Sequence, residues 1–124
     1  INTFDDIDAA LEQSGADGIM IGRGCYGKPW FINQAMTYLR TGERMAEPDL
    51  YQQYETILEH YERMLDHYGT TGGARMARKH LGWYTKGLRS SAEFRSDVNR
   101  VEDPAVVKAM LKEFYLPLCE QEAA

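Results

Sequence analysis

The chain has 124 residues, of which 44% are hydrophobic and 27% are charged, a composition typical of a folded globular protein rather than a disordered segment. Its formal net charge of −5 at pH 7 argues against a surface that is basic throughout. No apolar run approaches the roughly 20 residues of a transmembrane helix. The N-terminal segment is acidic and amphipathic and does not resemble a signal peptide. We therefore expect a cytoplasmic protein with no membrane contact.

Hydrophobic residues recur with helical spacing along most of the chain. Pro29 and Pro104 suit the first turn of a helix, and Gly69 suits the end of one. Helices are expected over residues 4–14, 29–40, 49–68 and 73–89 (after a turn at 70–73), then over a short segment opened by a capping box at Ser90–Glu93, and finally from Pro104 onward. Four helices with short connections and one apolar face each predict an antiparallel bundle in the second part of the chain.

One segment, Ile19–Ile21, departs from the helical pattern. Its three consecutive apolar residues favour a strand that is covered on both faces, as in a parallel sheet. A lone strand leaves N–H and C=O groups unpaired along both edges, which is costly when they are buried. Three explanations follow: the chain is the C-terminal piece of a larger α/β protein, two copies exchange this segment in a homodimer through residues 1–24, or residues 1–24 are poorly ordered. We favour the first.

A glycine–arginine–glycine turn, Gly22–Gly24, follows this expected strand directly. In βα barrels, the loops after the last strands often bind phosphate, because glycines expose backbone N–H groups and the next helix points its positive end at the anion. Arg23 would add a charge-assisted hydrogen bond. A tight turn with a surface arginine explains the same residues equally well, but the position after a buried strand favours a phosphate site.

Positive charge is concentrated in one region. Residues 75–100 contain seven Lys or Arg and two acidic residues, a local charge of +5 that leaves −10 for the rest of the chain. On a helix over 73–89 the cations share one arc and the apolar residues the other, with Gly82 leaving space for a phosphate backbone or another helix. A solvated basic face accounts for the helix alone equally well. The candidate phosphate contacts are Arg75, Arg78, Lys79, Lys86, Arg89, Arg95 and Arg100.

No catalytic or metal site stands out. Cys25 and Cys119 are far apart and lack partners at metal-ligand spacing, so we expect free thiols in a reducing compartment. His60 and His67 are expected to be exposed or partly packed, and His80 to be half-buried at the edge of an apolar face. Cys25 has no His or Asp beside it to activate a nucleophile, so we expect it to be a small buried residue.

The motifs ADGIMIGRGCYGKPW, ARMARKHLGWYTKG and AEFRSDVNR, in this order, closely resemble the C-terminal part of bacterial tRNA-dihydrouridine synthases of the B-type branch. The resemblance extends over essentially the whole chain. It implies that residues 1–44 are the terminal remnant of an FMN-binding TIM (β/α)8 barrel and that residues 45–124 are a helical tRNA-binding domain. It further implies that Gly22 and Arg23 bind the FMN phosphate and that the cations named above contact the tRNA backbone.

Enzymes of that family use NADPH to reduce FMN and then reduce the C5=C6 bond of a tRNA uridine, which leaves its stack to reach the flavin. The resemblance places the flavin loop and the catalytic cysteine upstream of Ile1, and Cys25 does not align with that cysteine. We therefore expect this chain to need the N-terminal barrel and to be inactive alone. The alternative is a helical protein-interaction or oligomerisation module whose basic face meets an acidic partner and has no RNA role.

Overall fold

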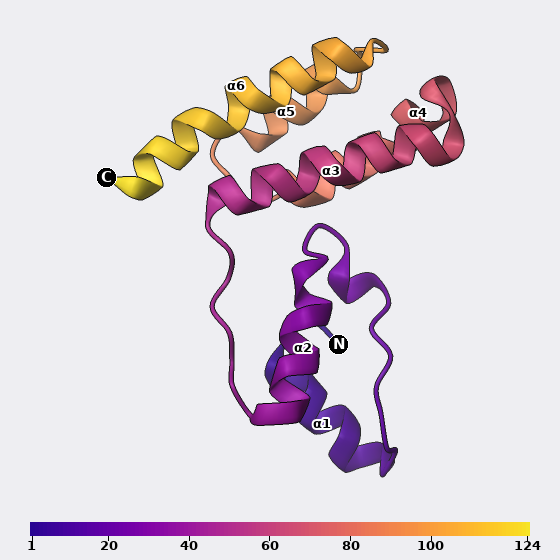
Figure 1. Ribbon diagram of the computed structural model, residues 1–124, viewed down its shortest axis with the longest axis vertical. Helices are drawn as coiled ribbons and strands as arrows, with labels where there is room; N and C mark the ends of the chain where they lie inside the picture. Colours follow the sequence, from indigo (N-terminus) through magenta and orange to yellow (C-terminus); the bar gives the residue numbers. More distant parts are fainter. The chain divides into compact units, whose positions relative to one another are not determined.

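The computed structural model describes residues 1–124, and its only regular elements are helices (Figure 1). The prediction of a mainly α fold is confirmed. No helix combines the length and the apolar character needed to cross a membrane. The elements are α1 (Phe4–Ser14), the short 3₁₀ turn η1 (Arg23–Cys25), α2 (Trp30–Thr41), α3 (Leu50–Tyr68), α4 (Thr70–Thr85), α5 (Ser91–Val98) and α6 (Pro104–Ala123).

The chain divides into two compact units, Ile1–Glu47 and Pro48–Ala124. The first unit contains α1, η1 and α2, and the second contains α3 to α6. The division falls shortly after residue 44, where the family resemblance placed a boundary. The indole N–H of Trp30 donates to the Glu47 carboxylate at 2.7 Å, which ties the end of the first unit to α2. This division concerns packing alone and assigns no role to either unit.

Both helices of the first unit form where they were predicted. The Thr3 hydroxyl accepts a hydrogen bond from the Asp6 N–H at 3.1 Å, while the Asp6 carboxylate accepts one from the Thr3 N–H at 3.1 Å. This reciprocal capping box starts α1, and Gly15 ends it in the left-handed region at φ +67°. The apolar faces of the two helices meet at Ile7 and Phe31, which are both buried.

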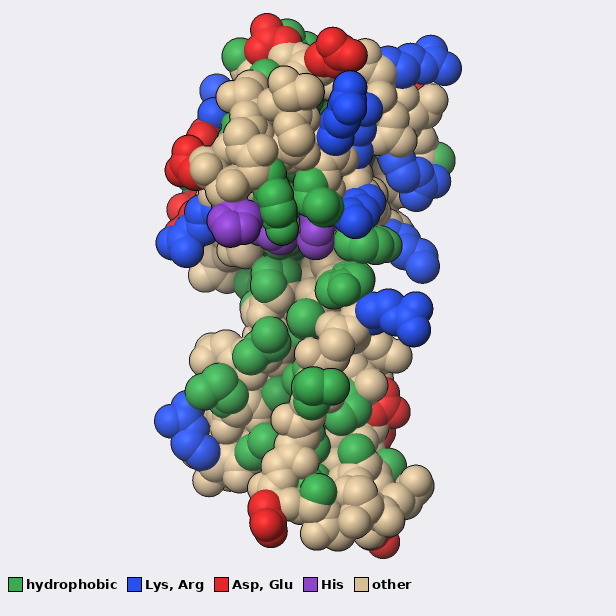
Figure 2. Space-filling model, turned by 90° about the vertical axis from the view of Figure 1, so that its right-hand side faces the viewer, with side chains coloured by type: hydrophobic (Ala, Val, Ile, Leu, Met, Phe, Trp, Pro, Cys, Tyr) green, Lys and Arg blue, Asp and Glu red, His purple; other side chains and the backbone are tan.

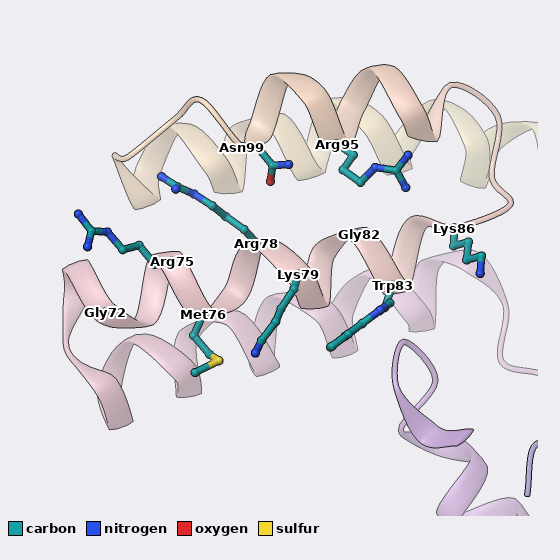
Figure 3. Close-up of a pocket in the computed structure, with 10 residues that line it drawn as sticks. All are labelled: Gly72, Arg75, Met76, Arg78, Lys79, Gly82, Trp83, Lys86, Arg95 and Asn99. Carbon is teal, nitrogen blue, oxygen red and sulfur yellow. The ribbon is translucent and has the colours of Figure 1, made fainter. Parts of the chain in front are cut away.

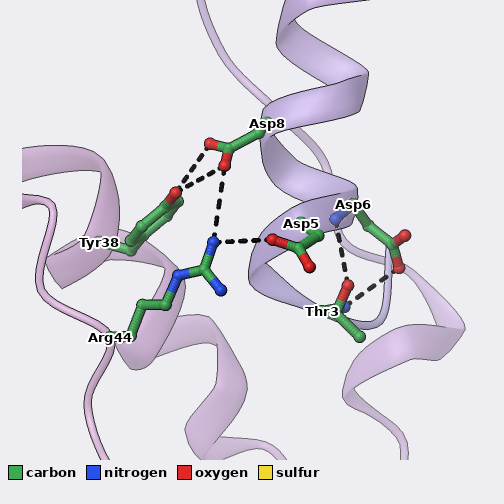
Figure 4. A network of polar contacts seen from close by, with 6 residues as sticks. All are labelled: Thr3, Asp5, Asp6, Asp8, Tyr38 and Arg44. Atoms are coloured by element: carbon green, nitrogen blue, oxygen red, sulfur yellow. Dashed lines mark hydrogen bonds and ion pairs between the residues drawn. The ribbon is translucent and has the colours of Figure 1, made fainter.

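Arg44 fastens the segment after α2 to α1 (Figure 4). Its guanidinium lies 2.7 Å from the Asp5 carboxylate and 3.8 Å from that of Asp8. The Tyr38 hydroxyl donates to the same Asp8 carboxylate at 2.7 Å. The guanidinium also lies over the rings of Phe4 and Tyr38, at 5.6 and 5.4 Å from their centroids. The segment leading out of α2 is therefore held by charge and by aromatic contact together.

The strand predicted over Ile19–Ile21 is wrong for this chain, because the segment is irregular and the structure contains no strand. A strand needs a neighbouring strand to pair its backbone N–H and C=O groups. The first unit contains two α-helices and a 3₁₀ turn, so no such neighbour is present there. Ile19 and Ile21 pack against the cluster around Ile7 and Phe31. Met20, between them, is 87% exposed. The segment keeps the alternating side-chain direction of a strand without its pairing.

The second unit is the antiparallel bundle that the sequence predicted. α3 packs against α4 and α6, and α5 packs against the same two helices. Opposite ends of α3 and α6 meet, since the Leu50 N–H donates to the Glu122 carboxylate at 2.7 Å and Glu62 forms an ion pair with Lys108. The buried residues at its centre are Tyr54, Ile57, Tyr61, Met64, Ala74, Ala77, Leu81, Tyr84, Phe94, Val98, Val107, Leu111 and Tyr115.

The start of α4 differs from the prediction, because residues 70–73 form its first turn and only Gly69 separates it from α3. Gly69 adopts φ +82°, which favours glycine and allows the chain to reverse within one residue. Gly73 then permits close packing of the two helices. A Cβ on Gly73 would lie 2.6 Å from the carbonyl oxygen of Met64, so no larger residue fits without displacing the backbone.

The end of α4 also differs, because the helix stops at Thr85 rather than near residue 89. Lys86 turns into an extended conformation at ψ 128°, and Gly87 has φ +87°. Arg89 therefore lies in the turn before α5 and is not on the predicted helical arc. The capping box predicted at Ser90 is wrong as well: Ser90 adopts φ +63° and its side chain makes no capping bond, since this conformation is not that of an ordinary N-cap.

Candidate nucleic-acid interface

A basic groove runs between α4 and α5 in the unit Pro48–Ala124 (Figure 3). It is open to solvent and has a volume of about 920 Å³. No acidic residue lines it. Its cations are Arg75, Arg78, Lys79, Lys86 and Arg95, and the remaining lining residues include Met76, Trp83 and Asn99. A groove with this lining favours a negatively charged ligand that can also contact apolar surface.

The groove exists because α4 has two chemically different faces. Ala77 and Leu81 point into the bundle and are almost fully buried. Arg75 and Lys79, four residues apart, are exposed on the groove side. The space-filling view shows Lys and Arg side chains gathered along one side of the α3–α6 unit (Figure 2). The separation of charge from apolar residues that the sequence predicted for this helix is confirmed for Arg75 and Lys79, whereas Arg78 is half-buried.

Arg95 reaches the groove from α5 and crosses over Gly82 of α4. A Cβ on Gly82 would lie 3.3 Å from Cδ of Arg95, which is closer than ordinary van der Waals contact. The sequence suggested that Gly82 leaves room for a phosphate backbone or another helix. Instead, the aliphatic part of the Arg95 side chain occupies the space above Gly82, and the Arg95 guanidinium reaches the groove.

Arg78 is held differently from the other groove cations. It is half-buried, whereas Arg75, Lys79 and Arg95 are exposed. One of its Nη atoms donates to the carbonyl oxygen of Val101 at 3.4 Å. Its Nε atom is buried and makes no hydrogen bond within the protein. Part of this cation's hydrogen-bonding capacity is therefore directed toward the protein rather than toward the groove.

The other predicted phosphate contacts lie outside the groove lining. Arg89 is exposed in the turn between α4 and α5, and Arg100 is exposed just after α5. Their roles stay predictions. Trp83 and Asn99 line the groove but were not singled out from the sequence. Helical spacing from Lys79 could have identified Trp83, whereas Asn99 reaches the groove only through the packing of α5 on α4.

Gly22 and Arg23, the predicted phosphate-binding pair, lie in the first unit at the 3₁₀ turn η1. The Gly22 carbonyl accepts from the Cys25 N–H at 3.3 Å and from the Cys25 thiol at 3.1 Å. Arg23 is exposed and has a glycine on either side. Arg23 supplies the charge that a phosphate needs and Gly22 is open, whereas a Cβ on Gly24 would clash with the Ile1 carbonyl oxygen. Cys119, like Cys25, is a free thiol, as expected.

A group of aromatic and imidazole rings stands beside the groove on α3 and α4. Nδ1 of His60 is hydrogen-bonded to the Tyr84 hydroxyl at 2.8 Å, and the rings of His60 and His80 are 5.0 Å apart. The His80 ring meets that of Trp83 edge-on at 5.0 Å. Burial lowers the pKa of His60, and burial together with the charges of His60 and Lys79 lowers the pKa of His80. Both imidazoles therefore favour the neutral form.

Residues 1–119 match the family model described as Dihydrouridine synthase (Dus). A probable tRNA-dihydrouridine synthase from Rickettsia conorii is 51% identical over 120 residues, which cover 97% of this chain and 36% of that protein. The tRNA-dihydrouridine synthase B of Xanthomonas axonopodis pv. citri is 42% identical over 105 residues, covering 85% of this chain and 32% of that protein. The chain thus spans about a third of the length of the curated relatives it matches.

Proposed function

Because this chain belongs to the dihydrouridine synthase family, we propose that it acts as the C-terminal part of an enzyme that reduces the C5=C6 bond of uridine in tRNA. In this proposal its helical unit binds the RNA. The observation that carries the proposal is the groove between α4 and α5, which is lined by five cations and no acidic residue. The relatives are named tRNA-dihydrouridine synthases, and tRNA is a polyanion that such a groove can hold.

The groove has the length and charge for several phosphates of one RNA strand. At 1.5 Å per residue, α4 rises by roughly 15 Å between Arg75 and its last residue, Thr85, and Lys86 follows directly. Lys79 lies between them, and Arg95 faces them from α5. Folded RNA is recognised largely through its backbone shape, so an array of exposed cations on rigid helices suits it. The acidic excess elsewhere on the chain would reduce indiscriminate binding.

In the same proposal, Gly22 and Arg23 hold the phosphate of FMN. The exposed guanidinium of Arg23 supplies the charge for a phosphate, and Gly22 leaves the backbone before it open to the ligand. Bound FMN, reduced by NADPH, would supply the hydride for uridine. Neither Cys25 nor Cys119 is assigned as the acid that protonates the base, since the Cys25 thiol is bonded to the Gly22 carbonyl within its own turn.

The first unit presents an apolar surface that a partner would cover. Ile32, Met36 and Leu39 lie on one side of α2 and are each about half exposed, and Met20 is almost fully exposed. We assign this surface to contact with the remainder of the same enzyme, which accounts for about two thirds of the relatives' length. If the chain occurs alone, a homodimer through residues 1–24 is the alternative, and it would cover Met20. The proposed site of action is the cytoplasm, where the tRNA substrate is found.

The proposal is tested by titrating the chain into a fluorescently labelled, unmodified tRNA transcript at several salt concentrations. The double variant Arg75→Gln/Lys79→Gln should bind more weakly and should lower the salt slope by about 1.4 to 1.8, since each lost phosphate contact removes about 0.7 to 0.9. Lys112→Gln, which removes an exposed cation on α6 outside the groove, is the matched control and should bind like the wild type. A duplex DNA of similar length serves as the competitor.

Unchanged affinity and slope in the double variant would refute the role of the groove. Light scattering on the purified chain addresses the alternative of an oligomerisation module. A stable dimer that binds tRNA no better than duplex DNA would favour that alternative over RNA binding.

A further inference from the structure

Arg78 on α4 reaches toward two other parts of the second unit, the segment after α5 and α3. Its Nη donates to the Val101 carbonyl at 3.4 Å, beyond the end of α5. Its Nε is buried, as is the hydroxyl of Tyr61 on α3, and neither atom has a hydrogen-bond partner in the protein. Burial and the charge of Glu62 raise the pKa of Tyr61, while the positive charge of Arg78 acts in the opposite direction, so the guanidinium lies near this phenol.

The Val101 carbonyl is a fixed point because the turn around it is closed by hydrogen bonds. The Val101 N–H donates to the Val98 carbonyl at 3.2 Å, and the Arg100 N–H donates to the Asp97 carbonyl at 3.2 Å. Val98 itself is only 1% exposed and anchors the end of α5 in the core. A group bonded to the Val101 carbonyl therefore holds this end of α5.

α5 runs antiparallel to α4, and Arg78 holds the end that is farther from the connecting turn. The other end is joined to α4 through residues 86–90. Arg95 and Asn99, which form the far wall of the groove, lie between these two attachments. The contact between Arg78 and the Val101 carbonyl therefore adds to the core packing of Val98 in holding this wall of the groove.

We infer that Arg78 is a positioning residue that holds α5, and with it Arg95, at the distance from α4 that RNA binding requires, and that it does not itself bind a phosphate. This inference rests on the proposed function. It separates Arg78 from the exposed cations Arg75 and Lys79. A planar guanidinium with five donors can bond a carbonyl while lying in a half-buried slot, which the compact ammonium of a lysine does not reproduce. The geometry of the side chain matters here more than its charge.

The test compares charge-preserving and charge-removing variants at two positions of the same groove. Arg75→Lys should bind labelled tRNA within about twofold of the wild type, while Arg75→Gln should lower the salt slope by about 0.7 to 0.9. Arg78→Lys keeps the positive charge but should misplace Arg95. Its affinity for tRNA should therefore fall about three- to tenfold, and its salt slope should fall as much as that of Arg95→Gln. Arg78→Gln should behave like Arg78→Lys.

A double-mutant cycle shows whether Arg78 acts through Arg95. Arg78→Lys combined with Arg95→Gln should bind no more weakly than Arg95→Gln alone, whereas the losses from Arg75→Gln and Arg95→Gln should multiply. Arg78→Lys binding like the wild type, or losses at 78 and 95 that multiply, would overturn the inference. If the wild-type chain does not bind tRNA at all, the proposed function fails and the inference fails with it.

A measurement on the wild-type chain covers the case in which Arg78→Lys does not fold, as judged by circular dichroism. The NMR signal of the Arg78 Nε–H should exchange slowly with solvent and should keep its chemical shift when tRNA is added. The corresponding signal of Arg75 should exchange rapidly and shift. An Arg78 signal that exchanges rapidly and shifts like that of Arg75 would contradict the inference.

Discussion

Gly82 on α4 lies directly beneath the side chain of Arg95 on α5, so closely that a Cβ on the glycine would be 3.3 Å from Cδ of the arginine. Gly82 therefore affects both the stability of α4 and the position of the Arg95 guanidinium. A glycine inside a helix is less favourable than alanine by about 1 kcal/mol, yet here it leaves the path by which Arg95 enters the groove.

Gly82→Ala should therefore change stability and RNA affinity in opposite directions. We expect the free energy of unfolding to rise by up to about 1 kcal/mol, because alanine favours the helix and the long arginine stem can move by a few tenths of an ångström. Affinity for tRNA should fall about threefold, because Arg95 is displaced. Urea unfolding and tRNA titration measure the two effects, with Arg95→Gln as the reference for loss of the cation. An unchanged affinity would show that Arg95 reaches its phosphate by another path.

Gly73→Ala should be destabilising, although alanine favours helices, because its Cβ would lie 2.6 Å from the Met64 carbonyl oxygen. We expect a loss of about 1 to 3 kcal/mol from this overpacking, measured by urea unfolding. Gly72→Ala is the matched control on the same turn. Its Cβ would have the Tyr68 Cβ at 3.9 Å as its nearest neighbour, so this variant should be neutral or stabilising. Equal effects at the two positions would contradict the close approach of α3 and α4.

Acid should destabilise the bundle through its paired histidines. Burial lowers the pKa of both His60 and His80 from the ordinary value of 6.5, so the unfolded chain binds protons more readily than the folded one. The resulting stability is fully present above pH 6.5 and is lost as the pH falls through 6.5 toward the lowered values in the fold. Melting temperatures recorded between pH 8 and pH 5 should fall over this range. His60→Gln/His80→Gln should melt with a flatter dependence on pH.

Removing the hydroxyl of Tyr115 should not weaken the bundle. The side chain is fully buried, its hydroxyl has no hydrogen-bond partner in the protein, and burial raises its pKa far above the usual value for tyrosine. Because the hydroxyl is desolvated without a compensating bond, Tyr115→Phe should leave the free energy of unfolding unchanged or raise it by about 1 kcal/mol. Tyr61→Phe should behave similarly. A loss of more than about 1 kcal/mol in either variant would reveal a hydrogen bond to this hydroxyl.

The sequence predicted those parts of the fold that depend on local pattern. Apolar residues at helical spacing, together with Pro104 at the start of α6, were sufficient to place most helices. The predicted strand at Ile19–Ile21 fails because strand formation depends on a partner elsewhere in space. The end of α4 was missed because the basic and apolar pattern continues to Arg89, while the conformation of Gly87 ends the helix earlier.

The candidate site was predictable only along a single helix. Arg75 and Lys79 share a helical face, so their common side of the groove follows from spacing. Arg95 and Asn99 enter it through the packing of α5 on α4, which no local pattern determines. Arg78 shares the periodicity of its neighbours but is half-buried, and it bonds the Val101 carbonyl, a contact that helical spacing does not predict.

The one-residue connection at Gly69 and the tight contact at Gly73 fasten α4 to α3 along the side opposite its cations. Because α4 is anchored in this way, its cations should keep the same spacing in the free chain and in the RNA complex. Little backbone entropy would then be lost on binding, and the encounter should be fast and electrostatically steered. Added salt should consequently slow association more than it speeds release.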